Sequence, residues 1–361
     1  LIKYLNINFK LLKKKKKLLI IGALLAFAFA ACEKEDNPLP GKYSQGVFIS
    51  NEGPFMDGSG TISFYDPKTK TIQNDIFELA NNRPLGNIVQ SVEVFKDKAY
   101  VVVNNASKIE VVNAGTFEST GVIEGLSQPR YFLGINEEKA YVSDWAGHVA
   151  IINLNKYEKK GTISTSHGPD RMILSGSNVW VLNSAGMSSD STLMIIDTNT
   201  DKVIHTMVVG GNPSDLVQDK EGNIWVICGG VFDWMNPENN TDGSLVKINP
   251  NDFSIIGRTM MEGTDFAPKL AVNKEKNRIL FSYNGKIYSL NTGASSLNAF
   301  ELVMEKTCYA LGIDPDNDEI YFSDPLDFSQ SGVIYRYDAS GSTMIDSVRA
   351  GIIPGNLRFI R

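Results

Sequence analysis

Aromatic and arginine side chains are the residues of this chain best suited to binding chemistry. A long polar segment, residues 228–243, carries Phe232 and Trp234 among asparagines and acidic residues. Arg130 and Arg171 lie one and two residues after a proline, in similar sequence contexts. Aromatic faces stack on flat ligands, and a guanidinium group donates several hydrogen bonds in one plane. These residues therefore indicate recognition of a polar small molecule.

Signals for catalysis are weak by comparison. The histidines are far apart, and the sequence has no H-x-H, H-E-x-x-H, C-x-x-C, G-x-S-x-G or G-x-x-x-x-G-K-[ST] pattern. Acidic residues such as Glu52, Asp144 and Asp324 lack the spacing of a calcium loop, and solvated turns explain them better. We therefore expect no catalytic residue, no metal site and no cofactor, and we expect that the protein is not an enzyme.

The scaffold that must position the binding residues is a repeat. A short apolar phrase ending in a polar loop recurs seven times, as VFISN, AYVVVN, AYVSD, VWVLN, IWVIC, ILFSY and IYFSD, centred on positions 48, 100, 141, 180, 225, 280 and 321. A β-type unit that repeats about every 40 to 50 residues is typical of propeller blades. The sequence thus predicts an all-β, seven-bladed β-propeller. Two β-sandwiches are the alternative, but sandwiches do not repeat one phrase seven times.

Each repeat divides into four strands in the same way. An innermost strand, often opened by proline, precedes the apolar phrase, as in PRYFLGI at 129, PDRMILS at 169, PSDLVQD at 213 and PKLAVNK at 268. A third strand ends in a turn led by Asp or Asn, whose side chain can accept bonds from nearby backbone amides. A fourth strand completes the blade.

The two ends of the repeat region complement each other. GVFISN begins without an innermost strand before it, whereas residues 354–361 (PGNLRFIR) form an innermost-strand phrase with no blade after it. The C-terminal segment should therefore supply the innermost strand of the N-terminal blade, which closes the ring.

In such a propeller the loops that follow the second strands and the loops between blades emerge on one face. The former are long in blades one, four, five and seven, so that face is where we expect a ligand. A loop folded over its own blade, with Trp234 buried, and arginines that only form ion pairs at the wall remain open alternatives. The candidate ligand-binding residues are Asn51, Glu52, Asn87, Asn104, Arg130, Tyr131, Asp144, Trp145, Arg171, Phe232, Trp234, Tyr309 and Asp324.

The N-terminal segment has the pattern of an export signal. Residues 13–17 are lysines, and a 14-residue apolar stretch from Leu18 to Ala31 precedes Cys32. We expect residues 1–31 to be a lipoprotein signal peptide and Cys32 to be the lipidated residue. Residues 32–44 would then be an anchored linker and residues 45–361 the propeller. An ordinary solvated linker is the alternative for the segment after Cys32.

Charge narrows the range of partners. Residues 1–31 contain seven of the 35 Lys and Arg and none of the 41 Asp and Glu, so removing them changes the formal net charge from −6 to −13. An acidic surface repels nucleic acid and anionic lipid, so we expect membrane contact only through the lipid anchor. Cys228 and Cys308 are expected to be free core thiols, with a disulfide as the alternative.

Residues 45–361 resemble the YncE-like seven-bladed propellers, through phrases such as STLMIIDTNTDKVIHTMVVGGNPSDLVQDKEGNIWV. The sequence CEKED at positions 32–36 resembles the export signal of surface lipoproteins of Bacteroidetes, and NEGPFMDGSGTISFYDP resembles their propellers, among them the BtuG-type corrinoid-binding proteins. This resemblance implies a propeller on the outer face of the outer membrane that captures a corrinoid such as cobalamin for a TonB-dependent transporter. It also implies that Asn51 and Glu52 lie at or near the ligand face.

Three hypotheses follow for the function. The first is a lipid-anchored capture protein for a corrinoid or another small ligand. The second is a propeller enzyme of the lactonase or lyase type, which requires acid–base or metal groups that converge in the funnel. The third is a glycan- or protein-binding adhesin, which requires a flat platform of Trp145, Phe232 and Trp234 facing solvent.

Overall fold

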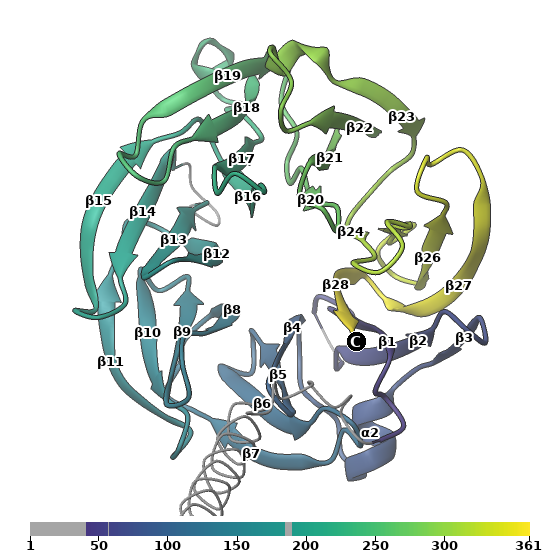
Figure 1. Cartoon of the computed structure of the whole chain (residues 1–361). Helices are drawn as coiled ribbons and strands as arrows, with labels where there is room; N and C mark the ends of the chain where they lie inside the picture. Colours follow the sequence, from purple (N-terminus) through teal and green to yellow (C-terminus); the bar gives the residue numbers. More distant parts are fainter. Residues whose placement is uncertain (1–40, 57, 185–189) are drawn as a thin grey trace, which may run out of the picture. The chain divides into compact units, whose positions relative to one another are not determined.

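A computed structural model describes residues 41–56, 58–184 and 190–361 of this chain. The described chain forms seven four-stranded antiparallel sheets, arranged as blades around a central axis (Figure 1). The predicted all-β, seven-bladed propeller is therefore confirmed. The signal peptide expected at 1–31 and the lipidation of Cys32 lie outside the described residues, and only 41–44 of the expected linker are described.

The strand bounds follow the repeat closely. Blade one contains β28 (Pro354–Ile360), β1 (Gly46–Asn51), β2 (Thr61–Asp66) and β3 (Thr71–Gln73). Blade two contains β4 (Val89–Phe95), β5 (Lys98–Val103), β6 (Lys108–Asn113) and β7 (Ser119–Ile123), and blade three contains β8 (Pro129–Gly134), β9 (Lys139–Asp144), β10 (His148–Asn153) and β11 (Glu158–Ser164). Blade four contains β12 (Pro169–Ser175), β13 (Asn178–Asn183), β14 (Thr192–Asp197) and β15 (Lys202–Val208).

The remaining blades have the same order. Blade five contains β16 (Pro213–Gln218), β17 (Ile224–Cys228), β18 (Gly243–Ile248) and β19 (Ile255–Met261). Blade six contains β20 (Leu270–Val272), β21 (Arg278–Tyr283), β22 (Lys286–Asn291) and β23 (Glu301–Glu305), and blade seven contains β24 (Leu311–Ile313), β25 (Ile320–Asp324), β26 (Ser331–Tyr337) and β27 (Met344–Ile352). A short helix, α2 (Ile76–Asn81), and two 3-10 turns (Pro237–Asn239 and Leu297–Ala299) lie between strands.

The apolar phrases form the second strand of every blade, and these strands are almost completely buried on both faces. Trp180 and Trp225 are fully buried and pack between neighbouring blades. Removing such large apolar surfaces from water is the main term that holds adjacent blades together. The outermost strands are largely exposed, as in β15 and β19, so the core lies in the inner part of the ring.

The expected turns after the third strands are also present. In six blades the leading Asp or Asn side chain accepts a hydrogen bond from the backbone N–H two positions later; these residues are Asp66, Asn113, Asn153, Asp197, Asn249 and Asn291. In blade seven Asp338 accepts from the amide four positions later. These local bonds favour the tight reversal between the third and fourth strands.

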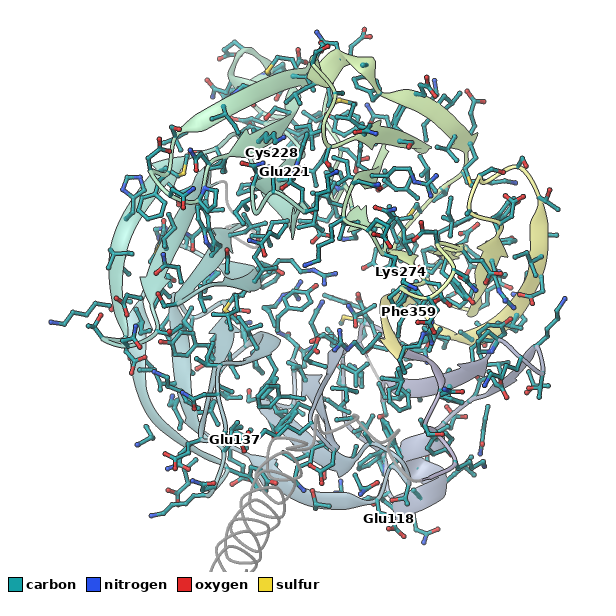
Figure 2. All side chains as sticks on the ribbon, viewed as in Figure 1. Glu118, Glu137, Glu221, Cys228, Lys274 and Phe359 are labelled. Carbon is teal, nitrogen blue, oxygen red and sulfur yellow. The ribbon has the colours of Figure 1, made fainter. Side chains whose placement is uncertain are left out.

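The ring closes as predicted from the two ends of the repeat region. β28 pairs with β1 in antiparallel register, with Val47 opposite Phe359 and Ile49 opposite Leu357, and both strands meet in Figure 1. Phe359, labelled in Figure 2, packs edge-on against Tyr321 of blade seven, with 5.2 Å between ring centroids. Closure by β28 gives β1 a partner along its whole length.

A network of ion pairs and hydrogen bonds also joins blade seven to blade one, farther from the axis than the pairing of β28 with β1. Arg336 is buried, and its guanidinium contacts Glu319 at 2.7 Å, Asp346 at 3.3 Å and the Tyr65 hydroxyl at 3.2 Å. It also donates to the Pro67 carbonyl at 3.0 Å. Because Tyr65 and Pro67 belong to blade one, this network connects the N-terminal strands to β26.

Three further findings concern the expected chemistry of the chain. Cys228 and Cys308 are free thiols, as expected, and burial raises the pKa of each to about 12. Tyr43, which the sequence places in the linker, is buried against Phe48 and Phe117. Within the described part of the chain, no helix is both long and apolar enough to span a membrane.

Candidate functional site

The loops of blades three to six surround a cavity of about 640 Å³ on the predicted face. We call it the funnel cavity. Inter-blade loops and loops after second strands both contribute to it, as the alternation of strand directions requires. Its lining residues are Arg130, Tyr131, Trp145, Asp170, Ser184, Asn212, Pro213, Ser214, Gly230, Phe232, Thr264, Asp265, Phe266, Ala267 and Lys269. The volume lies within the range of sites for small molecules, about 300 to 1,000 Å³.

One wall of the funnel cavity is built around Arg130. Its guanidinium lies 3.8 Å from the centre of the Trp145 ring and pairs with Asp170 at 3.3 Å, and it also donates to Gln90. The Trp145 indole N–H and the Ser184 hydroxyl donate to the same Asp170 oxygen, both at 3.2 Å. These bonds hold Trp145 and Arg130 as one stacked unit with fixed orientation.

The next wall repeats this arrangement with different residues. Arg171 stacks on the Tyr131 ring at 4.3 Å, and its Nε lies 3.8 Å from Asp215. Burial raises the pKa of the Tyr131 hydroxyl, which is therefore neutral at physiological pH. Both arginines thus form ion pairs with aspartates, which is the alternative that the sequence analysis left open. A ligand in the cavity meets the Arg130 guanidinium, which is already paired and stacked, and the Tyr131 ring on which Arg171 lies.

The rim of the funnel cavity carries exposed aromatic side chains. Phe232 and Phe266 line the cavity and are 66% and 97% exposed, and Trp234 of the same loop as Phe232 is 78% exposed but does not line it. The alternative in which this loop buries Trp234 is therefore wrong. Gly230, which has a φ of 82°, starts the loop, and a Cβ there would lie 2.3 Å from the Thr241 carbonyl oxygen.

Internal hydrogen bonds explain why this loop projects. Asp233 accepts from the amides of Met235 and Asn236, both at 3.0 Å, and from the Asn239 side chain at 3.1 Å. The Thr241 amide also donates to the Val231 carbonyl at 3.0 Å. The loop thus satisfies much of its own backbone, and its first residues are bonded outside it, where Gly229 and Gly230 donate to the Asn212 and Gly211 carbonyls.

Glu52 and Tyr309 form a contact between blades one and seven. The Tyr309 hydroxyl donates to Glu52 Oε1 at 3.0 Å. Burial raises the pKa of the Glu52 carboxyl, although the Tyr309 hydrogen bond and the charges of Arg130 and Lys269 oppose this. Burial also raises the pKa of the Tyr309 hydroxyl, and the nearby Glu52 adds to this shift. Neither residue is part of the cavity lining.

Five other predicted residues support the loops and do not line the funnel cavity. Asn51 bonds Thr61, Ser63 and the Gly351 amide, and Asn104 donates to the Pro129 carbonyl at 3.0 Å. Asp144 accepts from the amides of Ser127 and Gln128, and Asn87 donates to the Pro54 carbonyl at 3.0 Å. Asp324 accepts from the Leu326 amide at 2.8 Å.

The structure thus brings Arg130, Tyr131, Trp145 and Phe232 together around the funnel cavity, with Arg171 stacked on Tyr131. Lys269 and Asp170 also line it, and neither is among the candidates from sequence. Lys269 lies in the predicted inner-strand phrase PKLAVNK, and the sequence alone does not reveal that this lysine lines the cavity. The one clue in the sequence is that Lys269 directly follows Pro268, as Arg130 directly follows Pro129.

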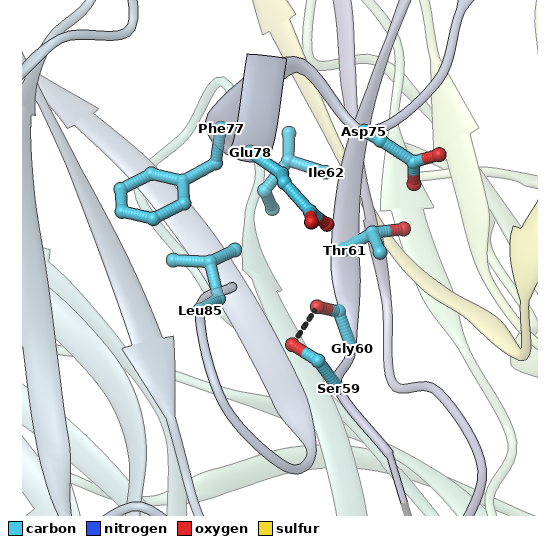
Figure 3. Close-up of a pocket in the computed structure, with 8 residues that line it drawn as sticks. All are labelled: Ser59, Gly60, Thr61, Ile62, Asp75, Phe77, Glu78 and Leu85. Carbon is cyan, nitrogen blue, oxygen red and sulfur yellow. Dashed lines mark hydrogen bonds between the residues drawn. The ribbon is translucent and has the colours of Figure 1, made fainter. Parts of the chain in front are cut away.

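The described residues form no metal centre, and a second cavity among them is too small for a ligand. Within residues 41–56, 58–184 and 190–361, no group of three or more His, Cys, Asp or Glu side chains could hold a metal ion. This second, very small cavity lies between β2 and α2 and is lined by Asp75, Phe77, Glu78, Ser59 and Leu85, among others (Figure 3). Its volume of about 10 Å³ holds at most one water molecule, so it is no ligand site.

Comparison with known proteins identifies a family and a shared fold. The profile of a family described as Domain of unknown function (DUF5074) matches residues 45–351. No curated protein matches the sequence.

Among solved structures, a quinoprotein alcohol dehydrogenase-like protein from Bacteroides thetaiotaomicron superposes with a TM-score of 0.67 at 18% identity, covering 88% of this chain and 79% of that one. Hydrazine synthase from Kuenenia stuttgartiensis has a TM-score of 0.63 at 16% identity, covering 81% and 95%. A candidate 6-phosphogluconolactonase from Bacteroides fragilis has a TM-score of 0.64 at 9% identity, covering 89% and 100%. At these identities the likeness concerns the propeller fold alone.

Proposed function

The chain belongs to the DUF5074 family, and we propose that it is a non-enzymatic binding protein that holds a small polar ligand in the funnel cavity. The observation that carries this proposal is the cavity of about 640 Å³, lined by the stacked pair Arg130 and Trp145 and by Tyr131, on which Arg171 stacks, and rimmed by Phe232 and Phe266. Fixed aromatic and guanidinium faces recognise flat, hydrogen-bonding ligands with little loss of side-chain freedom.

A corrinoid is the ligand that we propose first. Its ring is broad, flat and edged with amide groups, which suits the stacked walls chemically. It is larger than the cavity, so part of the ring would lie outside and contact the exposed rim. The resemblance of the sequence to BtuG-type proteins supports this choice.

Isothermal titration with cyanocobalamin and cobinamide tests the proposal. We expect saturable heat with wild-type protein and at least tenfold weaker binding by Phe232→Ala, because a rim aromatic contributes about 1 to 3 kcal/mol to such contacts. Phe55→Ala is the matched control, since Phe55 is also exposed but does not line the cavity. No heat from either corrinoid at micromolar protein would overturn the corrinoid assignment.

The cellular part of the proposal is a lipid-anchored protein on the outer face of the outer membrane, which passes its ligand to a TonB-dependent transporter. The lysine-rich segment, the apolar stretch and Cys32 followed by acidic residues support it. Metabolic labelling with a palmitate analogue should mark the wild-type protein and leave Cys32→Ala unlabelled. Equal labelling of both would contradict anchoring at Cys32, and co-purification with a transporter tests the partner.

Glycan binding is the second candidate function. The exposed pair Phe232 and Trp234 supports it, because sugars stack on solvent-facing aromatic rings. Trp145 does not belong to that platform, since it stacks under Arg130. A glycan array with wild-type protein and Trp234→Ala distinguishes the two functions. Glycan binding that depends on Trp234, together with no corrinoid binding, favours the second.

A further inference from the structure

Lys269 is held at the funnel cavity by its backbone. Its amide donates to the Ser282 hydroxyl at 2.9 Å, and its carbonyl accepts from the Ser282 amide at 2.9 Å. Ser282 is buried in β21, so the start of the Lys269 side chain has a fixed position. The side chain lines the cavity from the inner end of blade six.

The ammonium group of Lys269 has no ion-pair or hydrogen-bond partner among the residues that the structure describes. Its Nζ lies 5.9 Å from the centroid of the Tyr309 ring. Three neighbouring carboxyl groups already have other partners. Glu52 accepts from the Tyr309 hydroxyl at 3.0 Å. Asp170 accepts from Arg130, Trp145 and Ser184. Asp215 accepts from the amides of Leu216 at 2.9 Å and Leu270 at 3.2 Å and pairs with Arg171.

An ammonium group in this position is destabilised. Burial lowers the pKa of Lys269, and the nearby Arg171 guanidinium adds to this shift, while Asp215 and Asp170 oppose it. A partly buried charge without a counter-ion loses hydration that nothing replaces. An anion that enters the cavity would restore that interaction, and the surrounding low-dielectric walls would strengthen it.

We propose that the funnel cavity binds the oxyanion of its ligand, a phosphate or a carboxylate, through Lys269. This inference rests on the proposed binding function and names a chemical group that the ligand must carry. A second polar residue lines the cavity beside it: Asn212 Oδ1 has no hydrogen-bond partner among the described residues, while its Nδ2 donates to the Gly230 carbonyl at 2.7 Å.

Three probes separate the sources of such an oxyanion: inorganic phosphate, benzoate and the neutral isostere benzamide. Isothermal titration compares wild type with Lys269→Gln, which removes the charge, and Lys269→Arg, which keeps it. Lys306→Gln is the matched control, because Lys306 is exposed and lies outside the cavity lining. Salt concentration is kept constant, since anion binding depends on it.

We expect phosphate, benzoate or both to bind wild type and Lys306→Gln with equal affinity. Binding to Lys269→Gln should be at least about tenfold weaker, and Lys269→Arg should restore the affinity. Binding of phosphate alone identifies a phosphate ligand, and binding of benzoate but not benzamide identifies a carboxylate. No heat from either anion, or equal affinity for wild type and Lys269→Gln, overturns the inference.

A second measurement does not depend on these affinities. Reductive ¹³C-methylation keeps each lysine charged and makes its pKa visible by NMR, and Lys269→Arg assigns the signal. Added phosphate or benzoate should raise the pKa of Lys269 and leave that of Lys306 unchanged; an unchanged Lys269 signal overturns the inference.

Failure of this inference and failure of the proposed function are distinguishable. Cyanocobalamin contains a phosphodiester, which cobinamide lacks. If both corrinoids bind wild type and Lys269→Gln equally, the binding function stands and the oxyanion role is wrong. If neither corrinoid binds but phosphate binds through Lys269, the oxyanion role stands and the corrinoid assignment is wrong.

Discussion

At the scale of single residues, the Glu52–Tyr309 contact links protonation to stability. The pKa of Glu52 is raised by burial in the folded protein, whereas in the unfolded chain it should lie near the ordinary value of about 4.3. Between these two values the folded state binds more protons than the unfolded state, so the free energy of unfolding falls as pH rises. The stabilising form is therefore the neutral carboxyl.

Glu52→Gln should remove this pH dependence, because the amide oxygen still accepts from Tyr309 and carries no charge. We expect the difference in unfolding free energy, wild type minus Glu52→Gln, to decrease from acidic pH through the raised pKa of Glu52. Urea denaturation over that range measures it. The exposed Glu275→Gln should leave the wild-type profile unchanged, and a flat difference for Glu52→Gln would contradict the linkage.

Residue types explain which parts of the site were predictable. Arg130, Tyr131, Trp145 and Phe232 were predicted because aromatic residues in polar loops and arginines after proline are conspicuous. Lys269 was not, because its importance comes from what surrounds it: carboxylates from two other blades already have other partners. An unpaired lysine beside carboxylates that already have partners exists only once inner strands far apart in the sequence lie side by side. No local sequence pattern therefore predicts it.

At the scale of elements, β28 carries the closure of the ring. Removing residues 354–361 should lower the thermal midpoint, because β1 loses its partner strand and exposes its backbone groups. Leu357→Ala is the milder variant, since Leu357 packs with Val47 and Ile49, and we expect a loss of about 2 kcal/mol. Calorimetry and denaturant titration measure both effects.

The control for this element is Leu302→Ala in β23. Leu302 is half exposed on an outer strand, so its loss should change stability by about 0.5 kcal/mol or less. If the truncated chain melted like the full-length protein, β28 would not hold the ring closed.

Elements were predicted well where a local signal repeats. Pro129, Pro169 and Pro213 each open the expected inner strand, and the final PGNLRFI becomes β28. β20 is shorter than its phrase, since it begins at Leu270, where the register with β21 starts. Helix α2 was not predicted, because one and a half turns leave no clear period in the sequence.

At the scale of the whole molecule, Arg336 ties the N-terminal strands to blade seven. Arg336→Met should lower the free energy of unfolding by about 3 kcal/mol, because Glu319 and Asp346 would keep partly buried charges without a counter-ion. Urea denaturation checks this value. Arg349→Met is the control, since the exposed Arg349 side chain donates to the Ser331 carbonyl and forms no ion pair among the described residues, so the change should cost about 0.5 kcal/mol or less. Equal losses for both variants would argue against the tie.

The pairing of β28 with β1 also has a consequence for biosynthesis. A ribosome makes β1, β2 and β3 first and β28 about 300 residues later, at roughly 5 to 20 residues per second. For tens of seconds the nascent chain therefore carries an incomplete first blade whose β1 edge is open to mispairing. Blades two to seven can assemble during that interval, so the earliest strands made would be among the last to become native, and a chaperone that shields β1 would act in this window.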